Sequence, residues 1–89
     1  LETAYYLRMQ AEDRPGVLAD VTRILGDAGI SIEAIIQKEL EPDAAHVPII
    51  MLTHRIRERQ MNDAIARTEA LSSIGGPVPR IRVEYLNKQ

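Results

Sequence analysis

Few residues in this sequence have the types and spacing that catalysis or metal binding requires. His46 and His54 are the only histidines, and they stand at opposite ends of one expected strand. An extended strand rises about 3.4 Å per residue and so holds them roughly 27 Å apart, which is too far for a shared metal ion. The chain has no Cys, which excludes disulfides and Cys-based zinc sites. Carboxylates such as Glu33 and Glu39 are interpreted as solvated, and we expect no catalytic residue and no metal site.

The segment Asp13-Arg14-Pro15-Gly16 is the strongest candidate for binding a ligand. It leads into an apolar helix, whose free N–H groups and positive dipole end attract an anion such as a carboxylate. Gly16 has no side chain, so a ligand can approach the main chain closely. The same residue types also suit an ordinary helix start, and the residues alone leave both interpretations open.

The elements that position this segment follow from apolar periodicity. Each half of the chain indicates a strand, a helix and a strand, and Asp13 or Arg14 is expected to cap the first helix. The expected elements are strands over Ala4–Ala11, 30–39, His46–His54 and 78–85, helices over Val17–Ala28 and Arg57–Leu71, a Gly29 stop and a turn over 41–45.

The resulting order βαββαβ predicts an α+β fold. Each helix has one apolar stripe, so both helices must cover the same face of the sheet. Right-handed crossovers then favour a ferredoxin-like sandwich with an antiparallel four-stranded sheet of order 4-1-3-2. Pro48 would fall in a central strand, and we expect it at the strand start or at a bulge. Ile35, Ile50 and Leu52 are expected on the other sheet face, where they favour a partner.

Composition narrows the possible functions. The chain has 89 residues, enough for a single domain over residues 1–89, and a net charge of −2, which gives no attraction to nucleic acid or an anionic membrane. RNA-recognition modules with this topology need an aromatic residue in the third strand, and metal chaperones need paired Cys. An acyl-phosphatase would need more phosphate-binding groups than Arg14. The cluster of Arg55, Arg57, Glu58 and Arg59 is interpreted as a solvated helix start.

Asp13-Arg14-Pro15-Gly16-Val17-Leu18, followed by Gly29-Ile30-Ser31-Ile32, resembles the ACT domain family, the regulatory modules of amino-acid metabolism. The stretches from Ser31 to Lys38 and from Val47 to His54 are similar to the C-terminal ACT domains of bacterial homoserine dehydrogenases. The chain also starts with Leu1 and lacks a signal-peptide segment, so we expect a regulatory fragment without its catalytic domains.

The resemblance implies a function for the fragment and for its parent. The parent would be a cytoplasmic NAD(P)-dependent enzyme that reduces aspartate semialdehyde to homoserine, towards threonine, methionine and isoleucine. The fragment would bind no cofactor or membrane and would sense an amino acid, with threonine expected, as a homodimer in contact with the catalytic domains. The implied ligand-binding residues are Asp13, Arg14, Pro15, Gly16, Val17 and Leu18, with Ser31, Ile32 and Glu33 from the neighbouring copy.

The resemblance also keeps an alternative open. Serine-sensing ACT domains carry a His and an Asn where this sequence has Ala11 and Asp13, and Ser31 replaces the usual Asn of the second strand. These replacements favour a dimerisation module of the same enzyme that has no ligand of its own.

Overall fold

The computed structural model describes residues 2–37 and 45–83, and the predicted elements are present in the predicted order. The expected strand end at Glu39, most of the turn over 41–45 and the strand end at Tyr85 lie outside the described residues. The elements are β1 (Glu2–Glu12), α1 (Val17–Asp27), β2 (Ile32–Gln37), β3 (His46–Thr53), β4 (Ile56–Arg57), α2 (Glu58–Glu69) and β5 (Arg80–Val83).

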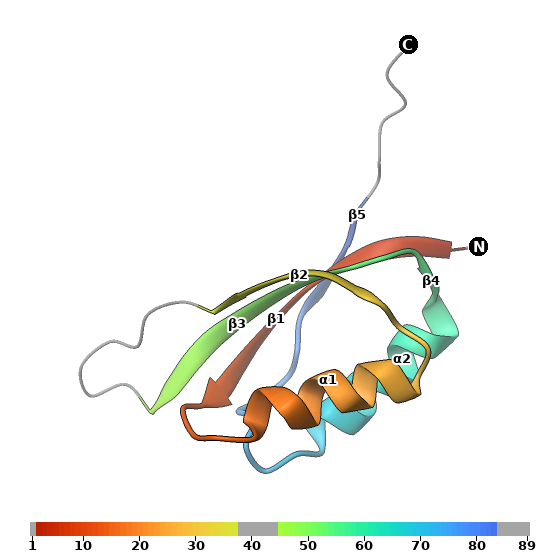
Figure 1. Ribbon diagram of the computed structural model, residues 1–89. Coiled ribbons are helices and arrows are strands. Elements are labelled where there is room, and N and C mark those ends of the chain that lie inside the picture. Colours follow the sequence, from red (N-terminus) through yellow and green to blue (C-terminus); the bar gives the residue numbers. More distant parts are fainter. Residues whose placement is uncertain (1, 38–44, 84–89) are drawn as a thin grey trace.

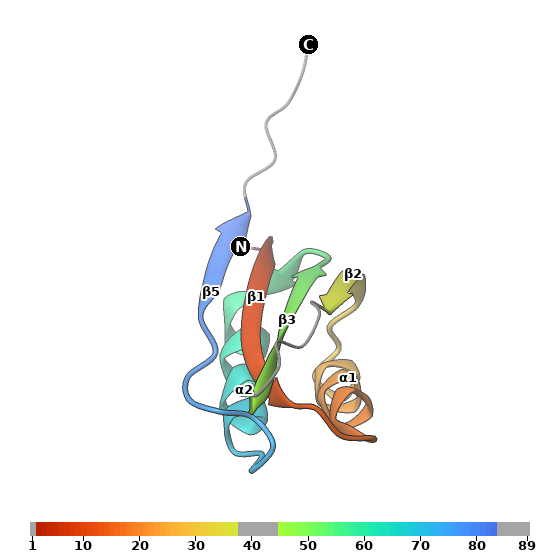
Figure 2. The same ribbon diagram turned by 90° about the vertical axis from the view of Figure 1, so that its left-hand side faces the viewer.

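The sheet has the predicted ferredoxin-like order. β1 lies at the centre between β3 and β5, and β2 pairs with β3, all antiparallel. Both helices cover one face of this sheet (Figures 1 and 2). The sequence did not predict β4, a two-residue strand that pairs Thr3 with Ile56. If the β1–β3 register continued, Thr3 would be opposite Arg55. Thr3 instead pairs with Ile56, so one extra residue is inserted between β3 and β4.

The core lies between the sheet and the two helices, as the apolar stripes predict. Alternate residues of β1 point into it, and each helix contributes one buried stripe. Its members include Tyr5, Leu7, Met9 and Ala11 from β1, Val17, Val21 and Leu25 from α1, and Met61 and Ala64 from α2. Burying this layer fixes both helix axes against β1, and thereby fixes where the segment before α1 lies.

A register shift in β2 corrects one prediction. Between Ile32 and Ala34 the pairing with β3 shifts, so alternation breaks at Glu33. Ile35 is therefore opposite Met51, a buried core residue on the helix side. The expected place of Ile35 on the uncovered face was wrong, because a bulge reverses the faces of all later residues. Ile36, opposite Ile50, takes that place.

The uncovered face of the sheet carries an apolar patch. In-register partners share a face, so Ile36 with Ile50, and Tyr6 with Leu52 and Ile81, lie together there. Ile36 is 56% exposed and Ile81 61% exposed. We name these five residues the open-face patch.

Pro48 is the third residue of β3, where the register with β1 is continuous, so the expected place at the strand start or at a bulge was wrong. It is opposite Gln10, whose main-chain oxygen accepts from Gly75 N–H at 2.8 Å, on the β5 side of β1. Because main-chain directions alternate in antiparallel pairs, Gln10 and Pro48 exchange no hydrogen bond. The missing N–H of Pro48 therefore costs no bond to β1.

Among the residues described, neither helix is long and apolar enough to cross a membrane.

Candidate functional site

The segment from Asp13 to Gly16 forms an exposed connection between β1 and α1. Gly16 is the residue before the first helical turn and has φ +90°, in the left-handed region. A side chain there would meet no atom within 4 Å but would strain the backbone. The expected capping by Asp13 or Arg14 is wrong, because no side chain caps α1 and the left-handed glycine makes the turn instead.

The start of α1 therefore presents main-chain donors at an open surface. Asp20 N–H, one turn into the helix, bonds Gly16 O at 3.0 Å, while the amides before it belong to the uncapped first turn. Val17 is buried and fixes the helix against the core, and Leu18 is half-buried beside it. The arrangement can accept a carboxylate or another small anion.

The charged side chains of the segment differ in their surroundings. Arg14 Nε donates to Glu12 Oε1 at 2.7 Å, so its guanidinium turns back to β1. Asp13 is exposed beside the helix start. A carboxylate at that position can hold an ammonium group while the amides hold a carboxylate, which are the two charges of a free amino acid.

One chain does not bring all the predicted binding residues together. Ser31 to Glu33 lie beyond the C-terminal end of α1, whereas Asp13 to Gly16 lie before its start (Figure 1). An eleven-residue helix separates the two groups by roughly 16 Å at about 1.5 Å per residue. Ser31 and Glu33 are exposed and Ile32 packs against the core. The two groups could meet only across two copies.

The histidine and carboxylate candidates that the structure describes form no metal site. No group of three or more His, Asp or Glu that could hold a metal ion occurs in residues 2–37 and 45–83. His46 is half-buried, with Nε2 2.9 Å from where a Gly75 Cβ would stand, and His54 is exposed. His46 therefore constrains Gly75 sterically.

Comparison with known proteins identifies the family. The sequence profile described as "ACT domain" matches residues 5–73. The chain belongs to the ACT domain family. Such domains generally bind amino acids, dimerise and form part of a larger enzyme.

The relatives narrow the context of this ACT domain. It is 59% identical over 86 residues to a homoserine dehydrogenase of Pseudomonas aeruginosa, covering 97% of this chain and 20% of that enzyme. It also matches a solved homoserine dehydrogenase of Thiobacillus denitrificans at TM-score 0.84 and 55% identity, over 94% of this chain and 18% of that one. The chain thus spans about a fifth of the length of these relatives.

A third comparison concerns the fold alone. The ACT domain of a GTP pyrophosphokinase from Chlorobium tepidum superposes at TM-score 0.70 with 11% identity, over 91% of this chain and 100% of that one.

Proposed function

We propose that this ACT domain senses an amino acid, with threonine expected, and so regulates a homoserine dehydrogenase. The parent would reduce aspartate semialdehyde to homoserine with NAD(P)H in the cytoplasm, on the route to threonine, methionine and isoleucine. The observation that carries the proposal is the uncapped start of α1 behind the left-handed Gly16, in a chain that matches homoserine dehydrogenases.

The chemistry of a free amino acid fits this helix start. The first-turn amides at Val17 and Leu18 would take the carboxylate, helped by the positive end of the α1 dipole. The Asp13 carboxylate would hold the ammonium group or the threonine hydroxyl. Gly16 leaves open space because nothing lies within 4 Å of where its Cβ would stand.

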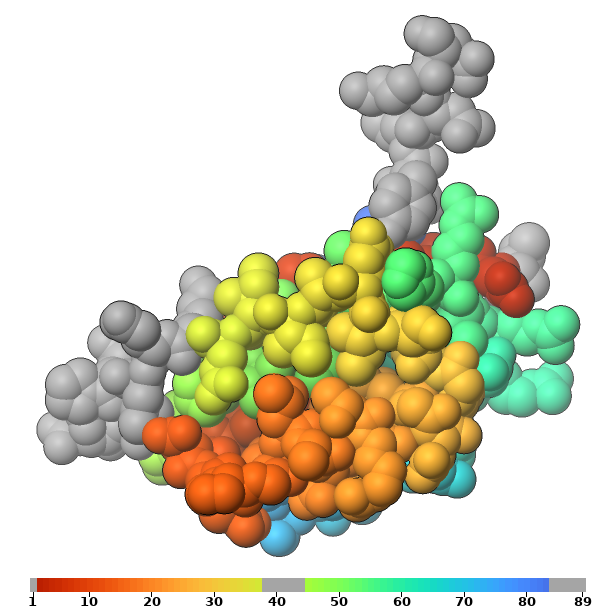
Figure 3. All heavy atoms as spheres, in the orientation of Figure 1, coloured from red at the N-terminus to blue at the C-terminus, as the bar shows by residue number. Residues whose placement is uncertain are grey.

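A second copy would complete the site. Among the described residues β2 pairs only with β3, so its outer edge is open. Figure 3 shows that edge (yellow) and α1 (orange) side by side on one face of the molecule. β2 runs back toward the end of the sheet where α1 starts (Figure 1). Antiparallel pairing of two β2 edges about a twofold axis would therefore bring Ser31 and Glu33 of one copy near Asp13 of the other.

A specific observation favours a second candidate, a dimerisation module of the same enzyme without a ligand. The open-face patch leaves Ile36 and Ile81 more than half exposed, and a contiguous apolar patch on a surface favours an interaction with a partner. A partner copy or the catalytic domains of the parent chain would bury it.

Calorimetric titration with threonine, with sedimentation on the same samples, separates the two candidates. Saturable heat from wild type, lost in Gly16→Val, supports sensing. The control is Gly26→Val, at a helical glycine that also has nothing within 4 Å and keeps an ordinary φ. A dimer that gives no heat up to millimolar threonine would contradict sensing and leave the assembly module.

A further inference from the structure

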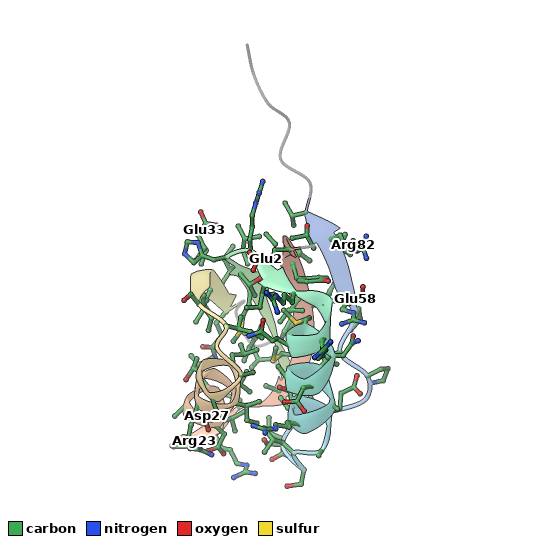
Figure 4. All side chains as sticks on the ribbon, turned by 90° about the vertical axis from the view of Figure 1, so that its right-hand side faces the viewer. Glu2, Arg23, Asp27, Glu33, Glu58 and Arg82 are labelled. Carbon is green, nitrogen blue, oxygen red and sulfur yellow. The ribbon has the colours of Figure 1, made fainter. Side chains whose placement is uncertain are left out.

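A cleft of about 490 Å³ lies at the start of α2. Arg57, Glu58 and Arg59 line it from the β4–α2 junction, Glu2 and Tyr5 from β1, and Arg82 from β5. Glu2, Glu58 and Arg82 can be followed at this end of the molecule in Figure 4. The β4–α2 junction that lines the cleft lies at the opposite end of the sheet from the segment before α1 (Figure 1), and the cleft shares no residue with the proposed amino-acid site.

The charge of the cleft is biased toward cations. Arg82 Nη2 lies 3.2 Å from Glu58 Oε1, and Arg57 Nε lies 4.0 Å from Glu2 Oε2. Arg59 makes no ion pair with the other residues that the structure describes. Three guanidinium groups thus face two carboxylates, and all four paired side chains are more than half exposed. Solvated ion pairs of this kind are weak, so a bound anion can replace a carboxylate as the partner.

The main chain adds donors at the same place. α2 is twelve residues long, and no side chain caps its first turn. Its N-terminal amides and the positive end of its dipole therefore point toward the same end as the guanidinium groups.

The hydroxyl of Tyr5 is an independent indication of a ligand. Tyr5 is 2% exposed, and its hydroxyl is a buried polar atom with no hydrogen-bond partner among the described residues. Buried hydroxyl groups are normally partnered, since an unpaired one loses its hydration without compensation. Tyr5 projects from the helix side of β1, and Arg80 lies over its ring at 5.8 Å. Tyr5 also lines the cleft, and its hydroxyl has almost no accessible surface, so a bound group that displaces the side chains over it can supply the missing acceptor.

We propose that this cleft binds an oxyanion, a phosphate or carboxylate group of a small metabolite. The amides of the first α2 turn and the guanidinium groups of Arg57, Arg59 and Arg82 hold the oxygens, and the Tyr5 hydroxyl donates to one of them. All of these groups come from one chain, so binding requires no second copy.

Titration of the ¹⁵N-labelled chain with sodium phosphate, at ionic strength held constant with chloride, tests the proposal. We expect saturable amide shifts at Glu58, Arg59 and Gln60, with a dissociation constant in the millimolar range. Arg59→Gln should weaken binding at least fivefold, and Tyr5→Phe, which keeps the ring, at least threefold. Arg23→Gln is the matched control, because Arg23 is an exposed helical arginine paired with Asp20 on α1.

A parallel titration with succinate, which carries carboxylate groups, identifies the bound group. The ligand with the lower dissociation constant shows whether the cleft prefers phosphate or carboxylate. Absence of saturable shifts with both ligands would overturn the proposal. So would an Arg23→Gln effect as large as that of Arg59→Gln, which would show only general charge attraction. Unchanged phosphate affinity in Tyr5→Phe, with the wild-type fold retained in its amide spectrum, would overturn the hydroxyl contact.

Discussion

The two helices begin in different surroundings, although neither start has a side-chain cap. α1 follows a left-handed Gly16 in an exposed segment, where Arg14 is turned away toward Glu12. α2 follows an extended Arg57 and starts at a cleft that Arg82 and the buried Tyr5 also line. Both starts present the same dipole, so the side chains around each decide what it can bind.

The two proposed sites also differ in the number of copies that each requires. Around α1, the remaining residues of the proposed site, Ser31 to Glu33, lie at the far end of the helix, so a neighbouring copy would supply them. Around α2, one chain would supply every group of the proposed site. Binding at α1 should therefore depend on association, and binding at α2 should not.

The largest expected effect comes from blocking the β2 edge. The main-chain N–H and C=O groups of Ile50 and Leu52 point toward β2, where those of Ile36 and Ala34 point back toward β3. The main-chain groups of Ile35 therefore point away from β3, toward the open edge of β2. Ile35→Pro therefore removes an outward N–H without breaking the β2–β3 ladder. We expect the dissociation constant of the dimer, measured by sedimentation, and that of threonine, measured by calorimetry, each to rise at least tenfold.

Ile35→Ala is the matched control for this change, since it shortens the side chain and keeps the N–H. It should retain most of the dimer. Phosphate binding at α2 should stay the same in both variants, and a parallel loss there would remove the distinction between the two helix starts.

Two glycine substitutions test the backbone conformation at the start of α1, with a smaller expected effect. Gly16→Ala places a side chain at φ +90° and should cost about 1–2 kcal/mol of unfolding free energy. Gly26→Ala, inside the helix with equal open space, should instead gain about 0.5–1 kcal/mol. Urea unfolding measures both. Equal effects of the two changes would mean that the backbone at Gly16 is not left-handed.

A smaller effect concerns the other end of α1. Gln60 Nε2, on α2, donates to Ala28 O at 3.0 Å and so holds the turn that leads into β2. Gln60→Ala should cost about 1 kcal/mol of unfolding free energy, because it leaves this carbonyl without its side-chain donor. Asn62→Ala, an exposed position on the same helix, should change stability by less than about 0.5 kcal/mol. If thermal unfolding gives equal values, the Gln60 contact contributes nothing.

The sequence predicted the fold well because burial and periodicity are local signals. Alternation over Tyr5, Leu7 and Met9, and the stripe from Val17 to Leu25, correctly predicted which faces meet. Three features had no local signal. The bulge at Glu33 depends on pairing with β3, β4 is only two residues long, and the cap of α1 is a backbone conformation.

The candidate sites show the same limit. The segment Asp13 to Gly16 could be found from the sequence because its residues are contiguous and resemble a family pattern. The cleft at α2 could not, because Glu2, Tyr5, Arg57 and Arg82 come together only through the sheet. The sequence placed Arg57 and Arg59 correctly at a solvated helix start, but nothing in it indicated that Tyr5 lines the same cleft.

In the proposed amino-acid site two copies contribute residues, so a mixture of two defective variants should bind threonine although neither variant does alone. Asp13→Lys should destroy the α1 side of the site, and Ser31→Leu the β2 side, so neither variant alone should bind threonine. In an equal mixture, half of the dimers are mixed, and each mixed dimer has one intact site out of two. Calorimetry should therefore recover wild-type affinity at about a quarter of the wild-type number of sites. A mixture that binds no threonine, although sedimentation shows mixed dimers, would contradict the shared site.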